Sequence, residues 1–212
     1  MKFVITAGPT REFIDPVRFL SNPSTGKMGF ALARAAIARG HEVTLVAGPV
    51  ALKTPKGVTR IDVVSARDML AAVEAAIAGS PADTVLVATA AVADWRPTDC
   101  APSKLKKREM TGVLKLVRNP DILKTVAGVR KVGFAAETDD VLGEAARKCR
   151  EKKLELIVAN DVREKGCGFG TDTNRVTFVR PDGSLERLPL LSKLAVARRI
   201  VRAIERGSSP CV

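Results

Sequence analysis

Apolar runs and helical repeats alternate through the first half of the chain. Apolar and β-branched residues dominate Lys2 to Thr6, Glu42 to Ala47 and Thr84 to Thr89, a pattern typical of strands buried in a parallel sheet. Between these segments, residues 29–39 and 66–78 place apolar residues at intervals of three and four, which predicts helices. This order predicts an α/β fold, namely a Rossmann-like, doubly wound, mostly parallel sheet with helices on both faces.

The second half continues the alternation less regularly. Lys131 to Ala136 and Leu156 to Ala159 predict two further strands, with a helix from Val141 to Lys152 between them. Pro181-Asp182-Gly183 separates two short apolar segments and predicts a small C-terminal hairpin. A closing helix is predicted over residues 192–206.

The composition is that of a globular protein with one sizeable core. The chain has 212 residues, of which 46% are hydrophobic and 27% charged. No linker, repeat or low-complexity tract interrupts it, so we expect one domain over residues 1–212. The apolar runs are too short to cross a bilayer, and no secretory signal opens the chain, so we expect no membrane attachment.

Cysteine and histidine usage excludes the usual zinc sites. The four cysteines, at 100, 149, 167 and 211, show no Cys-x-x-Cys spacing, and His41 is the only histidine. With no secretory signal, this pattern predicts reduced thiols and a cytoplasmic protein.

The net charge is +12, from 35 basic and 23 acidic residues, which suits nucleic acid, an anionic membrane or a polyanionic small substrate. With one tryptophan and no tyrosine the chain is poorly supplied for base stacking, so we expect no nucleic-acid partner. The arginines of the last helix are interpreted as a solvated face, whereas a second basic cluster lies in a polar loop at residues 104–108.

The loop from Ile5 to Met28, between the first strand and the first helix, is rich in glycine, hydroxyl and arginine residues. Freed backbone amides, hydroxyl donors and a helix N-terminus together form an anion-binding cradle. The loop lacks the Walker spacing because residue 21 is serine, and it lacks the Gly-x-Gly-x-x-Gly fingerprint of NAD sites. We therefore expect a site for another anion, with an ordinary surface loop as the alternative.

Polar residues also follow the other predicted strands, at the edge where such sheets bind ligands. Asp94 follows the strand that ends at Thr89, and the lysines between 104 and 107 are expected to share its loop. A carboxylate with several ammonium groups suits a metal-bound triphosphate, because the acid contacts Mg²⁺ and the lysines neutralise phosphate oxygens. The alternatives are a turn-capping role for Asp94 and a solvated lysine loop.

Two local features add to this picture. Asn119, followed by Pro120, predicts the start of a short helix with Asn119 as its N-cap. Lys148 and Lys152 lie four residues apart and, from spacing alone, form a solvated helix face. His41, the only histidine, is expected at the end of the first helix and remote from these loops, so it cannot complete a Ser-His-Asp or Cys-His arrangement. The expected chemistry is therefore positioning and charge neutralisation, as in nucleotidyl or phosphoryl transfer to a small acid.

Eight motifs occur in one order and together resemble a known family. They are Thr6 to Glu12, Asp15 to Asn22, Gly26 to Gly29, Ala90 to Asp94, Lys104 to Lys107, Asn119 to Leu123, Gly133 to Thr138 and Ala159 to Val162. From the first strand to the last helix the chain is similar to phosphopantothenoylcysteine synthetase, the ligase of coenzyme A biosynthesis. In many bacteria this domain follows a flavin-dependent decarboxylase domain; here the motifs begin near the first residue. We therefore expect a stand-alone synthetase, with a separate phosphopantothenoylcysteine decarboxylase as a candidate partner.

The resemblance implies a two-step reaction on 4′-phosphopantothenate, L-cysteine and CTP. The acid's carboxylate attacks the α-phosphate to give an acyl-cytidylate and pyrophosphate, and the cysteine amine then displaces CMP. Eukaryotic members typically use ATP, so an ATP-using ligase is the alternative. The family also implies Mg²⁺ and a homodimer.

The family's site residues carry over by motif. Asn22 is expected to hold the acyl intermediate with Arg18 beside it, and Lys104 to meet the triphosphate near a dimer interface; these are the expected catalytic residues. Asp94 is expected to hold both nucleotide and metal. The expected nucleotide-binding residues are Gly8, Ser24, Gly26, Ala88, Thr89, Ala90, Asp94, Lys104, Pro120, Asp121, Ile122, Leu123, Phe134, Lys148 and Lys152.

Two departures from the family pattern bear on this expectation. Pro23 stands where the family often has an arginine or histidine followed by two serines, and it removes a backbone donor from the phosphate loop. The segment 108–113 is short, which changes the geometry of the lysine flap. The rival hypotheses are a nucleic-acid-binding protein, a non-catalytic nucleotide-binding regulator and a reductase that uses NADPH.

Overall fold

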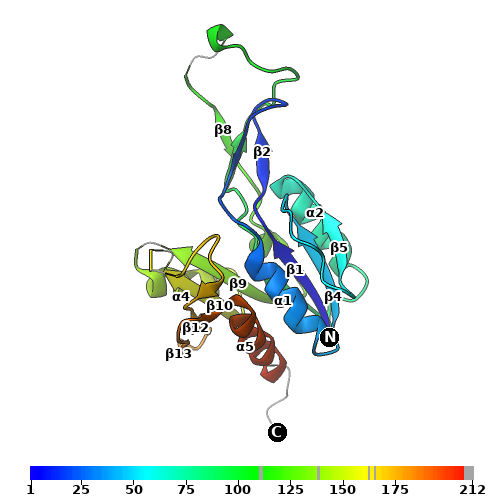
Figure 1. Cartoon of the computed structure of the whole chain (residues 1–212), viewed down its shortest axis with the longest axis vertical. Helices are drawn as coiled ribbons and strands as arrows, with labels where there is room; N and C mark the ends of the chain where they lie inside the picture. The colour runs from blue at the N-terminus through cyan, green and yellow to red at the C-terminus, as the bar shows by residue number, and fades with distance from the viewer. Residues whose placement is uncertain (110–111, 138, 162, 165, 208–212) are drawn as a thin grey trace.

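A computed structural model describes residues 1–109, 112–137, 139–161, 163–164 and 166–207 (Figure 1). Thr138 and Val162 of the family motifs, residues 110–111 of the short segment, and Cys211 lie outside these ranges. The centre is an eight-stranded sheet. In sheet order its strands are β13 (Leu185–Arg187), β12 (Thr177–Val179), β10 (Leu156–Asp161), β9 (Arg130–Glu137), β6 (Thr84–Ala88), β1 (Lys2–Ala7), β4 (Glu42–Ala47) and β5 (Thr59–Asp62).

The strands from β10 to β5 in this order pair in parallel, and the β12–β13 hairpin adds to the edge in antiparallel fashion. After β1 the chain crosses to β4 and β5, and then returns to β6 on the other side of β1. The winding direction therefore reverses between β1 and β6, the switch point where ligands bind in such sheets. The predicted doubly wound, mostly parallel sheet and the C-terminal hairpin are both confirmed.

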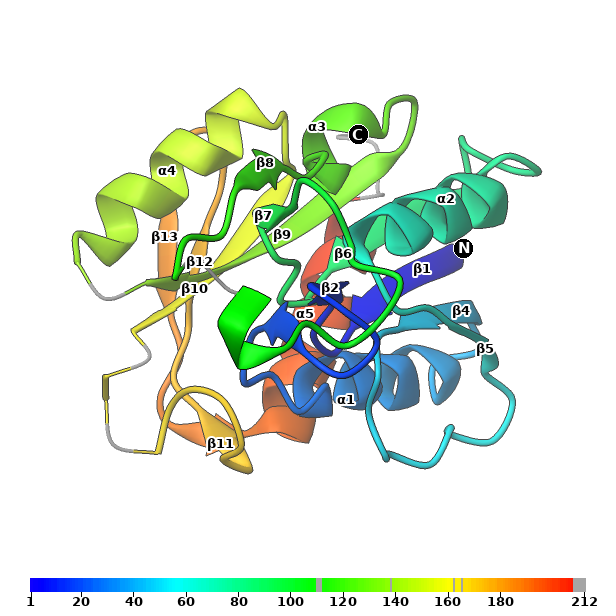
Figure 2. The same cartoon turned by 90° about the horizontal axis from the view of Figure 1, so that it is seen from above.

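Helices cover both faces of the sheet (Figure 2). Alternate residues of β1 serve the two faces, with Phe3 and Ile5 in one apolar cluster and Val4 in the other, which explains its uninterrupted apolar sequence. One face carries α1 (Lys27–Ile37) and α5 (Lys193–Arg206), and the other carries α2 (Ala66–Ile77), α3 (Ile122–Thr125) and α4 (Val141–Glu151).

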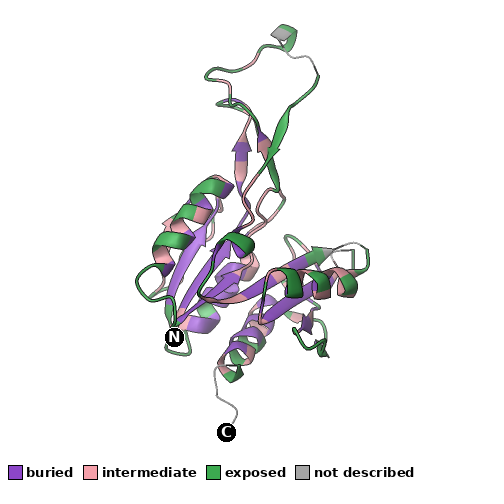
Figure 3. Cartoon of the chain, turned by 180° about the vertical axis from the view of Figure 1, so that it is seen from behind, coloured by how far each residue is buried: buried purple, intermediate pink, exposed green. Residues whose placement is uncertain are grey.

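An arm projects beyond the sheet, at the end opposite to the chain's N-terminus (Figure 1). Most of the described residues of the arm are exposed (Figure 3). The loop expected over Ile5 to Met28 contains an antiparallel hairpin of the arm, which the sequence did not predict because each strand has three residues. The arm consists of β2 (Arg11–Phe13) paired with β3 (Phe19–Ser21), β7 (Trp95–Pro97) paired with β8 (Leu116–Arg118), and the 3₁₀ turn η1 (Lys107–Glu109).

A buried carboxylate ties the two parts of the arm together. Asp15 accepts hydrogen bonds from Val17 N (2.9 Å), Arg18 N (2.8 Å) and Leu105 N (3.2 Å), and it pairs with the Arg18 guanidinium. Arg18 in turn donates from Nη2 to the Leu105 carbonyl (2.9 Å). The Arg18 hydrogen bonds hold the pKa of the Asp15 carboxyl well below its usual range. The β2–β3 turn and residues 104–108, which we call the lysine segment, are therefore held by one charged group.

A third short pair joins the loop after β10 to the start of α5. Its strands are β11 (Thr173–Asn174) and β14 (Leu191–Ser192), and Ser192 is the N-cap of α5. Within the described ranges, no helix combines the length and the apolar character needed to span a membrane.

Candidate active site

The loops that follow β1 and β6 are joined by hydrogen bonds at the switch point. Ala91 N donates to Gly8 O (2.9 Å), and Ala90 N donates to the Thr6 hydroxyl (3.2 Å). Asn22 is half-buried and donates from Nδ2 to the Ala91 carbonyl (3.2 Å). Both strand ends and Asn22 therefore form one connected unit.

Glycines let α1 start directly against these strand ends. Gly26 is the N-cap of α1 with φ 76°, a left-handed conformation that suits glycine, and it offers no side-chain cap to the first-turn amides. A Cβ on Gly29 would lie 2.5 Å from Ala7 Cβ and 2.7 Å from Thr89 Oγ1. The N-terminus of α1 is thus placed at the β1–β6 switch point, as the expected anion cradle requires.

A pocket that we call the back pocket opens between the end of β6 and α3. Its lining joins segments that are far apart in the sequence: the loop after β6, the start of α3, the middle of β9 and the end of α4. Most of the residues expected to bind nucleotide are among those lining it. The lining residues are Thr6, Ala88, Ala90, Ala91, Val92, Ala93, Asp94, Asn119, Pro120, Asp121, Ile122, Leu123, Phe134 and Lys152.

The N-cap of α3 is Asp121, so the expectation that Asn119 caps this helix is wrong. The Asp121 carboxylate accepts from Lys124 N (3.2 Å). Asn119 instead links two loops, because its Nδ2 donates to Ala93 O (2.8 Å) and its Oδ1 accepts from Arg96 Nη1 (3.0 Å). Asp121 has an extended backbone, so the helix begins at Ile122 and not at Pro120.

A lysine of β9 donates hydrogen bonds to the C-terminal end of α3. Lys131 Nζ donates to the carbonyls of Leu123 (2.8 Å) and Val126 (3.3 Å), at the C-terminal end of the helix. Burial is the main cause that lowers the pKa of its ammonium group, and nearby Lys153 and Lys152 contribute to the same effect. No sequence pattern indicated this role, because Lys131 lies in a strand that was predicted from its apolar content.

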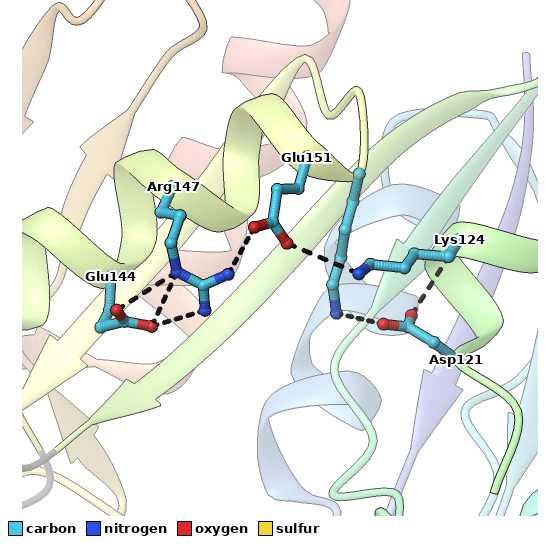
Figure 4. A network of polar contacts seen from close by, with 6 residues as sticks. Asp121, Lys124, Glu144, Arg147 and Glu151 are labelled. Atoms are coloured by element: carbon cyan, nitrogen blue, oxygen red, sulfur yellow. Dashed lines mark hydrogen bonds and ion pairs between the residues drawn. The ribbon is translucent and has the colours of Figure 1, made fainter.

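Charged residues join α3 to α4 beside the back pocket (Figure 4). Arg147 pairs with Glu144 (2.7 Å) and Glu151 (2.6 Å), and Glu151 pairs with Lys124 (3.5 Å). Hydrogen bonds to Arg147 lower the pKa of both glutamates.

Lys152 directly follows α4, which ends one residue earlier than predicted. Its Nζ lies 2.9 Å from Asp121 Oδ2, so the ion pair bridges the pocket lining from α4 to α3.

A second pocket, the front pocket, opens on the α1 and α5 side of the same sheet edge. The expected residues Ser24, Gly26, Thr89 and Phe134 line it, and Phe134 lines both pockets. Its full lining is Ser24, Thr25, Gly26, Lys27, Met28, Gly29, Thr89, Phe134, Ala136, Asn160, Gly168, Phe169, Asn174 and Lys193. Gly168, Phe169 and Asn174 were missed because an irregular loop gives no periodic signal in the sequence. Lys193 was missed because it begins a helix that was predicted from apolar spacing alone.

Several expected residues do not line either pocket. Gly8 and Asn22 touch the site through Ala91, whereas Arg18 is engaged by Asp15 and Leu105.

Two expected lysines also lie outside both linings. Lys148 is half-buried on α4, and Lys104 is exposed on the arm. The expectation that Asp94 and the lysines share one loop is wrong, because β7 pairs with β8 and carries the lysines away from Asp94.

A family model, curated relatives and a solved structure that are similar to this chain point to the same family. Residues 1–207 match the family model described as the DNA/pantothenate metabolism flavoprotein C-terminal domain. Over 206 residues the chain is 50% identical to the coenzyme A biosynthesis bifunctional protein CoaBC of Bacillus subtilis strain 168, covering 95% of this chain and 50% of that protein. It is 45% identical over 219 residues to CoaBC of Escherichia coli strain K12, covering 98% of this chain and 53% of that protein. The chain therefore spans about half the length of these curated relatives.

A solved structure is similar over nearly the whole chain. The crystal structure of the C-terminal domain of CoaBC superimposes with a TM-score of 0.79 at 44% identity, covering 97% of this chain and 94% of that one. The similarity thus includes the sheet, the helices and the segments that line both pockets.

Proposed function

The chain belongs to the family of the DNA/pantothenate metabolism flavoprotein C-terminal domain, and on that premise we propose that it is a ligase of coenzyme A biosynthesis that joins 4′-phosphopantothenate to L-cysteine with CTP. The observation that carries the proposal is the back pocket, where Asp94, the start of α3 and Lys152 converge at the switch point of the sheet. Such a set supplies a carboxylate, backbone amides and an ammonium group, which suits a nucleotide triphosphate. The acid and cysteine complete the substrates, and the expected location is the cytoplasm.

The reaction needs no nucleophile from the protein. In the first step a carboxylate oxygen of the acid bonds to the α-phosphorus, the bond from that phosphorus to the bridging oxygen breaks, and pyrophosphate leaves. In the second step the cysteine nitrogen bonds to the acyl carbon, CMP leaves with the bridging oxygen, and the nitrogen gives up a proton. The residues of the site act by positioning and by neutralising charge.

Each part of the nucleotide has a partner in the back pocket. The Lys152 ammonium, held by Asp121 at 2.9 Å, is placed to meet a phosphate. The amides at the start of α3 and the end of β6 can bind ribose or base, and Phe134 provides an apolar wall. Asn22 is fixed over the same strand ends by its bond to Ala91, which suits a group that holds the acyl intermediate.

The residues of the back pocket fit Mg²⁺ bound together with a triphosphate. Among the described residues no group of three or more His, Cys, Asp or Glu side chains could hold a metal ion by itself. Mg²⁺ keeps several waters and binds through one or two carboxylates plus phosphate oxygens, so Asp94 alone, or with Asp121, would suffice. When bound there, the ion would neutralise the charge of the triphosphate.

The arm supports a homodimer in which the lysine segment serves a second subunit. Large apolar side chains are exposed along the arm, including Val17 (55%), Trp95 (44%), Val113 (76%) and Leu116 (43%). Lys104 is exposed and lies outside both pockets of its own chain. We propose that dimerisation through the arm covers these side chains and brings Lys104 to the triphosphate bound by the partner subunit.

Mixed dimers test this placement. A Lys104→Ala chain and an Asp94→Asn chain should each be nearly inactive as homodimers. If Lys104 acts across the interface, mixing them creates some intact sites, and activity returns to a substantial fraction of wild type. No recovery in verified mixed dimers would contradict action across the interface.

The function itself is tested by pyrophosphate release. The purified chain receives Mg²⁺, 4′-phosphopantothenate and L-cysteine, with CTP and ATP in separate reactions and each substrate omitted in turn. Release that requires the acid and CTP is the expected result. Release with ATP alone would keep the ligase and change the nucleotide, whereas no release with either nucleotide would contradict the proposal.

A further inference from the structure

Three of the four arginines of α5 lie on one side of the helix. Arg199, Arg202 and Arg206 are three and four residues apart, a spacing that brings side chains together on a helix surface. All three line a cavity of about 330 Å³ between α5, the start of β10 and the β12–β13 hairpin, and Arg180 of the hairpin turn lines it too. We call this cavity the arginine hollow. The solvated face expected from the sequence is therefore concave and shared with a second element.

The two carboxylates among the described residues of the arginine hollow already have partners. Glu155 accepts hydrogen bonds from Arg130 Nε (2.7 Å) and Nη2 (3.0 Å). Glu186 pairs with Arg180 Nη2 (3.2 Å). Within the described part of the chain, by contrast, the side chains of the three α5 arginines make no hydrogen bond or ion pair. The hollow therefore holds three positive charges that no carboxylate of the described residues balances.

The helix itself does not account for these charges. Like charges three or four residues apart destabilise a helix slightly. The helix dipole favours a cation only in the last turn, where Arg206 is the only basic residue. The one carboxylate of α5, Glu205, pairs with Arg39 Nε (2.6 Å) and His41 Nε2 (2.9 Å), so it is engaged elsewhere. The other two arginines of the hollow thus have no local electrostatic partner, and an external anion would supply one.

The shape of the arginine hollow favours a small ligand. Its volume lies at the lower end of the range of about 300–1,000 Å³ that is usual for small-molecule pockets. Its lining includes Leu156, Phe178 and Ile204, which are at most 3% exposed. A stable protein partner would need a wider contact, roughly 800 Å² on each side. Since guanidinium groups bind phosphate oxygens in pairs, several of them in one hollow suit an anion with more than one phosphate.

The arginine hollow is separate from both pockets of the candidate active site. Leu156 begins β10, and Asn160, near the other end of that strand, lines the front pocket, which places the two about 13 Å apart along the strand. The back pocket is lined by α3 and by Lys152, on the sheet face opposite to α5. No described residue lines both the hollow and either pocket.

From these contacts we propose that the arginine hollow is a second anion site, which binds a small molecule carrying two or more phosphate groups. The phosphates lie against Arg199, Arg202 and Arg206, and Arg180 meets them from the hairpin. The bound ligand thereby joins the C-terminal half of α5 to the β12–β13 hairpin. The inference is independent of the proposed ligase reaction, because none of these residues lies in the candidate active site.

Titration of the full chain with inorganic tripolyphosphate in the absence of Mg²⁺ tests the proposal, with hydrogen exchange to locate the site. Tripolyphosphate should bind saturably and about tenfold or more tightly than inorganic phosphate, because it meets several guanidinium groups at once. It should also slow amide exchange in residues 178–187 and 199–207. Arg202→Gln should weaken binding at this site about tenfold, since it removes charge-assisted hydrogen bonds, and the slowed exchange should be lost with it.

Two control variants separate the hollow from other sources of binding. Arg198→Gln makes the same charge change on the same helix, at an exposed residue that does not line the hollow, and should retain the binding and the slowed exchange. Lys152→Met removes the ammonium group of the back pocket and should also retain both. Arg202→Gln should keep wild-type pyrophosphate release, so the failure of this proposal and the failure of the ligase proposal are distinguishable.

Several outcomes would overturn the proposal. Equal weakening by Arg202→Gln and Arg198→Gln would mean that binding follows the overall charge of the chain. Slowed exchange only around the back pocket, abolished by Lys152→Met, would place the ligand there instead. A tetraglutamate peptide that binds the hollow as tightly as tripolyphosphate would make an acidic peptide the ligand. Wild type that shows no saturable binding, or no slowed exchange in residues 178–187 and 199–207, would contradict the proposal without any variant.

Discussion

Gly29→Ala should lower both the stability and the activity of the protein, although alanine is the better helix former. A Cβ at this position would lie 2.5 Å from Ala7 Cβ, 2.7 Å from Thr89 Oγ1 and 3.1 Å from Thr6 O. Ala7 cannot retreat freely, because β1 pairs with strands on both sides, and Thr89 Oγ1 is held by Thr6 O at 2.6 Å. The neighbours that must give way are therefore anchored, and α1 has to move away from the sheet.

The magnitude decides between two opposing effects. Replacing glycine inside a helix gains about 1 kcal/mol, whereas overpacking a closely packed contact costs about 1–3 kcal/mol. We expect a net loss of about 1 kcal/mol, which lowers Tm by about 2–4 °C for a chain of this size. Activity should fall further than stability, by about tenfold or more, because the shift moves the first-turn amides of α1 relative to Thr89, and small misplacements in a site are costly.

Thermal unfolding and pyrophosphate release measure the two effects separately. Gly79→Ala is the matched control, since Gly79 has an ordinary φ and no atom within 4 Å of an added Cβ. This control should leave activity intact and keep or raise Tm. If Gly29→Ala behaves like the control in both assays, the close approach of α1 to the strand ends is not what positions the site.

Three further predictions follow from the supporting contacts. Lys131→Met should speed hydrogen exchange of the α3 amides and raise the Kd for CTP about tenfold, since it removes two charge-assisted hydrogen bonds worth about 1.5–3 kcal/mol each before discounting for partial exposure. Lys131→Arg should restore part of the loss, and unchanged exchange would refute the role. Asp15→Asn should lower Tm at neutral pH. Because the pKa of Asp15 in the folded protein lies below the ordinary 3.8, the Tm difference from wild type should be full above pH 3.8 and shrink as the pH falls through the lowered pKa. A Tm difference that persists unchanged in stronger acid would argue against the ion pair. Leu116→Glu should yield monomers in sedimentation analysis with loss of activity, and an intact dimer would remove the arm from the interface.

The central fold was predictable because its signals are long and mutually consistent. Strands such as β1 and β6 are buried on both faces, so their apolar sequence admits few other placements. The capping box of α2, in which Ser65 and Asp68 bond reciprocally, shows the same agreement between local sequence and structure. The sequence predicted the class of sheet, doubly wound and mostly parallel, but not the order of its strands, because it does not say which strand β6 will pair with.

The arm was not predictable for the opposite reason. Its strands have three residues each, and the residues that stabilise it are polar groups acting across long sequence separations. Asp15 reaches Leu105, 90 positions away, and no local pattern announces that contact. Treating Asp94 and the lysines as members of one loop failed because the β7–β8 pairing between them is such a non-local event.

The site shows the same division between residues that sequence motifs disclose and residues that only the fold assembles. Motifs disclosed Asp94, Phe134 and Lys152, which line one pocket although they come from three separate segments. They did not disclose Asn174 or Lys193, which are buried and line the front pocket. A motif records residue type and order, whereas the need for a hydrogen-bond partner arises only once water has been excluded. Buried polar residues of this kind are therefore ones that the sequence could not single out.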